Sequence, residues 1–203
     1  MKSFLPLCFL LLLAACGSLS QPIDVDDVAR SAGMSPLATP PLPEGKQEIR
    51  LWLSTGIVLP NQMLRLTYAH DRWLGELWRY WPRGEAEHGI DGWSHESFDQ
   101  TMERCGCVRT IRGPENVVCR VAEEKAIDWE SVALRLKRLD VAGLPEEVAH
   151  ANADGDTLDV EVRAGAAYHR VRYNHFNNSE SARCAGQVVQ MMKDLDSTVR
   201  CDR

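Results

Sequence analysis

The sequence predicts an α+β fold: a mainly antiparallel sheet with two longer helices packed on one face, braced by disulfides. Two observations lead to this prediction. Short segments in which apolar and polar residues alternate recur along the chain, as in half-buried strands. Two further segments repeat apolar residues at helical spacing, and a sheet needs such amphipathic helices to cover its apolar face.

The strands are expected from residue 47 onward. Ile49, Leu51 and Leu53 fall on one face of the first strand, and their polar neighbours fall on the other. The same pattern, or a turn signal between two apolar runs, predicts the remaining strands. The expected strands cover residues 49–53, 64–68, 76–81, a hairpin between Cys107 and Cys119, 158–162 and 168–174.

The helices are predicted from capping residues and apolar stripes. Asp128 is expected to cap one longer helix, which Gly143 and Pro145 end. Ser179 is expected to cap the other, which runs to about Asp196. Short helices are expected over residues 24–32 and 97–104.

The first residues carry the pattern of an export signal. Lys2 precedes an apolar run over residues 4–13, which is shorter than the roughly 20 residues that span a bilayer. The run ends in Leu13-Ala14-Ala15-Cys16, which resembles the lipobox of bacterial lipoproteins. The resemblance implies that residues 1–15 are removed and that Cys16 is lipidated. An ordinary signal peptide cleaved near Ala15 is the alternative.

The lipobox resemblance also implies an address in the cell. More than one acyl chain on Cys16 would make a stable membrane anchor. Gly17 follows the cysteine where, in enteric lipoproteins, an Asp resembles a signal for the inner membrane. We therefore expect an outer-membrane lipoprotein whose domain faces the periplasm. Its proline-rich residues 16–46 are expected to be a tether, and residues 47–203 a single domain.

Composition limits the classes of partner. The formal net charge of −6 at pH 7 does not favour nucleic acid, because phosphate contacts need clustered Lys and Arg. The expected partners are the membrane, through the lipid, and a protein or another envelope component. No cofactor is expected.

Five cysteines remain after Cys8 and Cys16 are set aside, and disulfides persist in an exported protein. Cys107 and Cys119 flank the predicted hairpin, so a bridge between them is expected, although Cys105 could replace Cys107. A second bridge would join two of the remaining cysteines and leave one thiol free. The remaining candidates are Cys105 (or Cys107), Cys184 and Cys201.

Tryptophans crowd into residues 52–93 and are candidates for partner contact. Trp52 falls on the polar side of its strand, and Trp78 lies in the third strand. Core packing is the alternative for the whole group.

The last hairpin carries the clearest cluster of positive charge. Arg170 and Arg172 share one face of its second strand and could grip an anionic partner. The simpler interpretation is cross-strand pairing with Asp159 and Glu161.

No catalytic motif is evident in the sequence. The pair His70-Asp71 and the loop with His88 and His95 could support a metal-assisted hydrolase, but neither has the spacing of a known zinc motif, and no metal ligand is expected. Asn152 to Asp159 is interpreted as a turn rather than a calcium loop. The chain is therefore expected to be a non-catalytic binding module. An inhibitor or immunity lipoprotein against a toxic periplasmic hydrolase is the main alternative.

Overall fold

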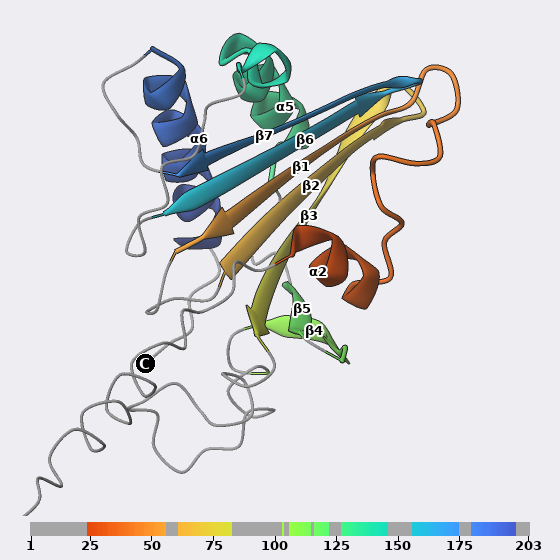
Figure 1. Cartoon of the computed structure of the whole chain (residues 1–203), viewed down its shortest axis with the longest axis vertical. Coiled ribbons are helices and arrows are strands. Elements are labelled where there is room, and N and C mark those ends of the chain that lie inside the picture. Colours follow the sequence, from red (N-terminus) through yellow and green to blue (C-terminus); the bar gives the residue numbers. More distant parts are fainter. Residues whose placement is uncertain are drawn as a thin grey trace, which may run out of the picture.

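Seven strands form one antiparallel sheet in the computed structural model, which describes residues 24–55, 61–82, 103, 106–114, 116–121, 127–145, 156–174 and 180–197 (Figure 1). The strands lie in the order β4-β5-β3-β2-β1-β6-β7. Their bounds are β1 Gln47–Ser54, β2 Asn61–Ala69, β3 Arg72–Pro82, β4 Cys107–Arg112, β5 Asn116–Val121, β6 Thr157–Ala164 and β7 Ala167–Asn174.

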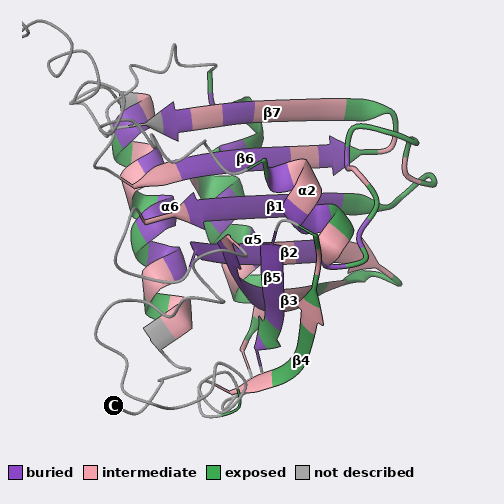
Figure 2. Ribbon diagram, turned by 60° about the horizontal axis from the view of Figure 1, so that its bottom comes forward, coloured by how far each residue is buried: buried purple, intermediate pink, exposed green. Residues whose placement is uncertain are grey.

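One face of the sheet carries the main hydrophobic core. Side chains alternate along a strand, so every second residue of the central strands points to this face. In the register of the sheet, Leu51 lies between Leu64 of β2 and Val160 of β6. Figure 2 shows how far burial extends along these central strands. The fully buried members from β1, β2 and β6 are Leu51, Leu53, Leu64, Leu66, Leu158 and Val160.

Helix α5, Trp129–Arg138, contributes to this core. Its N-cap is Asp128, as predicted, and the carboxylate of Asp128 accepts a hydrogen bond from the Ser131 amide at 3.1 Å. Ala133 and Leu136 are its buried residues. The 3₁₀-helix η1, Val141–Gly143, follows directly.

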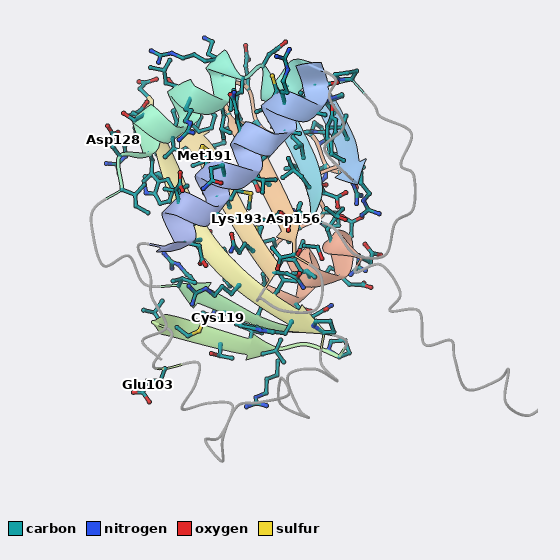
Figure 3. All side chains as sticks on the ribbon, turned by 90° about the vertical axis from the view of Figure 1, so that its left-hand side faces the viewer. Glu103, Cys119, Asp128, Asp156, Met191 and Lys193 are labelled. Atoms are coloured by element: carbon teal, nitrogen blue, oxygen red, sulfur yellow. A yellow bond between two sulfur atoms is a disulfide. The ribbon has the colours of Figure 1, made fainter. Side chains whose placement is uncertain are left out.

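Helix α6, Glu180–Ser197, contributes to the same core cluster through Val188, Met191 and Met192. Lys193 Nζ lies 2.6 Å from Asp156 Oδ2, which ties the helix to the start of β6 (Figure 3). The predicted α+β class, with a mainly antiparallel sheet, is confirmed by these strands and helices.

Helix α2, Val25–Ser31, corrects the predicted tether. Asp24 caps the helix, and Gly33 ends it with a backbone φ of 76° that suits glycine. Val28 and Leu37 are almost fully buried. The segment expected to be a spacer therefore belongs to the folded domain from Asp24 onward, because its apolar residues cover part of the sheet.

The surface that α2 covers is a second, smaller core. It lies on the opposite side of the strands from the main core, since Trp52 alternates with Leu51 and Leu53. Figure 2 shows α2 lying across the sheet. The buried members of this cluster are Val25, Val28, Ala29, Ala32, Met34, Trp52, Met63, Trp78, Tyr80 and Val118.

The hairpin between β2 and β3 is tighter than expected. His70 and Asp71 form its two-residue turn, with φ of 55° and 60°. Positive φ at both positions fits a type I′ turn, in which Asp and His are tolerated. The predicted third strand, residues 76–81, therefore starts four residues earlier, at Arg72. The pair His70-Asp71, considered above as a catalytic pair, forms this turn.

The disulfide between Cys107 and Cys119 is present, as predicted for the hairpin of β4 and β5. Cys184 of α6 is free and partly buried. Cys105 and Cys201 lie outside the described residues, so the second bridge stays a prediction. Residues 1–23, His88, His95 and, apart from Glu103, the helix expected over 97–104 also lie outside the described residues, so the predictions made for them stay predictions.

Candidate functional site

The two tryptophans predicted to contact a partner are buried. Trp52 is 1 % exposed and Trp78 is 5 % exposed, so the prediction that they form part of a surface patch is wrong. Trp52 Nε1 donates a hydrogen bond to Glu161 Oε2 at 2.8 Å, and its ring meets Tyr80 edge-on. Burial beneath α2 gives these rings a packing role, which was the alternative weighed from the sequence.

The two arginines of β7 pair with carboxylates of the fold. Arg172 Nε donates to both oxygens of Asp159, at 2.8 and 3.0 Å. Arg170 lies 3.7 Å from Asp159 and 3.5 Å from Asp26 of α2. Their positions fit the cross-strand pairing considered from the sequence, and Arg170 also links β7 to the N-terminal helix.

Other charged groups on this side of the sheet are also paired. Glu48, which is buried, accepts hydrogen bonds from Arg50 and from Arg65 at 2.7 and 2.8 Å. Burial alone raises the pKa of the Glu48 carboxyl, but the hydrogen bond from Arg65 and the charges of both arginines outweigh it, so the pKa lies below its usual range.

The segment after α2 is held to the same side of the sheet. Arg163 donates to the backbone oxygens of Ala38 and Gly165, at 2.8 and 3.1 Å. The amide of Leu42 donates to the Gly165 carbonyl at 3.1 Å. The polar groups of this side thus pair with one another or fasten the N-terminal segment.

A groove lies on the opposite side, between α5 and the sheet. Its volume is about 560 Å³, within the range of roughly 300–1,000 Å³ that is typical of small-ligand sites. Strands β1, β2, β3 and β6 supply one wall, and α5 with η1 supplies the other. We call it the α5 groove, lined by Gln47, Ile49, Tyr68, Trp73, Glu130, Ala133, Leu134, Leu136, Lys137, Val141, Ala142 and Val162.

The α5 groove is where the main core is left partly open. Along β1, Leu51 and Leu53 are fully buried, whereas Ile49 of the same face is only partly buried. Along β6, Val160 is fully buried and Val162 is only partly buried. The end of the central strands at which β1 begins and β6 ends thus presents apolar surface to the groove.

An aromatic pair lines the α5 groove. The rings of Tyr68 and Trp73 lie 5.3 Å apart in a tilted arrangement, on either side of the β2–β3 turn. Glu130 of α5 accepts a hydrogen bond from the Trp73 amide at 2.7 Å. This bond and the packing of α5 hold the helix beside the start of β3.

Gly75 explains how α5 approaches the sheet so closely. A Cβ atom at this position would overlap the ring of Trp129, the first residue of the helix. Only glycine leaves room for that ring against β3. The close contact fixes the start of α5 and therefore one border of the groove.

The two charged side chains that line the α5 groove, Glu130 and Lys137, differ in whether they already have a partner. Glu130 is engaged with the backbone of β3. Lys137 is exposed, and its ammonium group has no ion-pair or hydrogen-bond partner among the described residues. Arg135 and Arg138 lie beside it in the last turn of the helix. The groove thus combines an apolar floor with a border on which Lys137 carries the unpaired charge and Glu130 an engaged one.

Sequence reasoning did not identify the α5 groove. The alternation of Ile49 and Val162 with polar neighbours predicts that they are buried, and the length of a neighbouring helix does not reveal which end of a sheet stays open. The best signal in the sequence is Leu134, an apolar residue off the apolar stripe of its helix and beside a basic last turn. The structure leaves it 49 % exposed.

Within the described part of the chain, no group of three or more His, Cys, Asp or Glu side chains is arranged to hold a metal ion. No helix in those ranges combines the length and the apolar character needed to cross a bilayer. Asn152 to Gly155 of the predicted turn lie outside the described residues.

Comparisons with known protein families, curated proteins and solved structures found no match.

Proposed function

We propose that this chain is a lipid-anchored outer-membrane lipoprotein that acts, without catalysis, as a binding module for a protein or another envelope component. Its address follows from the lipobox resemblance at Cys16. Its binding surface is the α5 groove, and the observation that supports this is the partly exposed apolar floor formed by Ile49 and Val162.

The opposite side of the sheet is a weaker candidate for this role. Its aromatic rings are covered by α2, and its charged groups pair with one another or with backbone carbonyls. A partner there would have to replace these internal contacts. The α5 groove requires no such exchange, because Ile49 and Val162 of its lining are partly exposed and Leu134 is 49 % exposed.

We also infer how the two longer helices, α5 and α6, are arranged behind the groove. The two longer helices form a single layer on one face of the sheet. The residues that α5 and α6 bury belong to one cluster with the same strand residues, and Figure 3 draws both helices in front of the sheet. The groove then lies where this layer ends.

Affinity capture with the full chain tests the proposal. We expect an envelope component to be retained by the wild-type chain and lost with Leu134→Asp, which places a charge on the border of the groove. The matched control is Leu74→Asp. Leu74 is 44 % exposed and lies on the other face of β3, so this variant should retain the component.

Equal retention by both variants would contradict the proposed surface. The anchor is tested separately by labelling cells with palmitate. We expect label on the wild-type chain and none on Cys16→Ser. Unlabelled wild-type protein would contradict the proposed address but not the groove.

A further inference from the structure

We propose that the α5 groove binds an anionic amphiphile with one aliphatic chain, which lies along the apolar floor with its charged head beside Lys137. The inference rests on the proposed function, because it names the class of ligand for the same groove.

The lining favours an aliphatic chain. Most of the groove-lining residues are aliphatic, and they come from both walls, so a chain placed between them contacts apolar atoms on two sides. Among the lining residues Gln47, Glu130 and Lys137 carry an amide or a charge, Tyr68 carries a hydroxyl and Trp73 an indole N–H. A sugar or nucleotide would bury many polar groups here without partners.

The border favours a negative head group. The carboxylate of Glu130 already accepts a hydrogen bond from the Trp73 amide, whereas the side chain of Lys137 has no partner among the residues that the structure describes. The last turn of α5 adds Arg135 and Arg138. Asp140 follows directly, so residues 135–140 carry three positive charges and one negative charge on a chain whose formal net charge is −6. A carboxylate or phosphate head can form a charge-assisted hydrogen bond with Lys137.

The volume favours one chain. About 560 Å³ is suited to a small ligand, and complete membrane lipids with several acyl chains are larger than this. Fatty acids and lysophospholipids share the required chemistry, since each has one aliphatic chain and an anionic head. The experiment therefore compares both sources.

The test uses photoreactive probes on the full chain in its own membranes. Diazirine-bearing lauric acid and an acidic lysophospholipid are compared with the matching lauryl alcohol, and the labelled peptides are located by mass spectrometry. We expect both anionic probes to label groove residues such as Leu134 and Val162, and the alcohol to label them several-fold less.

Two variants test the role of the head group. Lys137→Gln is expected to reduce anionic labelling of the groove by about threefold to tenfold, because one charge-assisted hydrogen bond is lost. Arg138→Gln removes the same charge one residue away and does not line the groove, so it should have little effect. Lys137 is exposed, so folding should survive the change.

The possible results are distinct. Labelling of the groove by one anionic probe alone supports the class and identifies its source. Equal labelling of the groove by the acid and the alcohol, with no change in Lys137→Gln, would contradict the proposed anionic head group. It would leave the α5 groove as the binding surface. Labelling only outside the groove would contradict the proposal that the groove binds an amphiphile. The capture experiment with Leu134→Asp then decides separately whether the proposed surface binds another component.

Discussion

At the scale of single residues, two buried tryptophans differ in what their indole N–H groups do. Trp52 Nε1 donates to the buried carboxylate of Glu161, whereas Trp78 Nε1 is buried with no hydrogen-bond partner among the residues that the structure describes. Replacing Trp52 therefore removes a donor from a buried charge, and replacing Trp78 removes an unsatisfied donor.

We expect Trp52→Phe to lower the free energy of unfolding by about 1–3 kcal/mol more than Trp78→Phe does. Both changes delete a similar volume from the same cluster, so the difference isolates the hydrogen bond. Urea denaturation of the two variants measures it. Equal losses would mean that the Glu161 bond contributes little.

The lowered pKa of Glu48 has a consequence for stability against acid. A carboxyl whose pKa is lower in the folded state stabilises the protein above its unfolded pKa, near 4.3, and loses that contribution as pH falls through the folded value. We expect Glu48→Gln to lower stability at pH 7, since Arg50 and Arg65 lose their shared partner, and to flatten the decline below about pH 4.5. Denaturation curves at several pH values would show it; an unchanged acid decline would contradict the assignment.

At the scale of elements, the contact between Gly75 and Trp129 controls where α5 sits. We expect Gly75→Ala to destabilise the protein by about 1–3 kcal/mol, because the new methyl group must displace the Trp129 ring. Gly186→Ala is the matched control. Nothing lies within 4 Å of a Cβ at this helical position, so alanine there should stabilise α6 by about 0.5–1 kcal/mol. Thermal denaturation distinguishes the two, and equal effects would contradict this contact.

Helix α2 is a second element with a direct test. Val28 is 1 % exposed against the sheet, so Val28→Ala should cost about 1–3 kcal/mol of stability. Arg30→Ala removes only a surface ion pair with Asp27 and should cost at most about 1 kcal/mol. A free tether predicts no effect from either change, and that outcome in a denaturation experiment would restore it.

The elements were predictable to different degrees. Asp128 and Asp24 are N-caps with local hydrogen bonds, so their helices could be located from the sequence. The start of β3 could not be located from the sequence. Gly75 has a low strand propensity, and His70-Asp71 is not a common turn pair, but tertiary contacts such as that of Gly75 with Trp129 override these propensities.

The candidate site was harder to predict than the fold. Pairing of Arg172 with Asp159 was weighed from strand alternation, since both residues fall on one face of a hairpin. Burial of Trp52 depends on α2, which lies about 20 residues earlier in the chain, within the segment that the sequence predicts to be a tether. The groove depends on where helices of limited length leave a sheet uncovered, and side-chain patterns do not contain that information.

At the scale of the whole molecule, the packing of α2 shortens the connection to the proposed anchor. Eight residue steps separate Cys16 from Asp24, and a fully extended chain covers at most about 29 Å over them. A lipid on Cys16 would therefore hold the domain beside the membrane. Such a position suits a module whose groove receives an amphiphile from the envelope.

The most direct test of the central claim is site-specific photocrosslinking in living cells. A photoreactive residue replaces Leu134 at the α5 groove in one strain and Leu74 on the other face of β3 in a second. The account predicts a defined adduct at position 134 and none at position 74. No adduct at position 134, or the same adducts at both positions, would contradict the claim that the α5 groove is the binding surface of this protein.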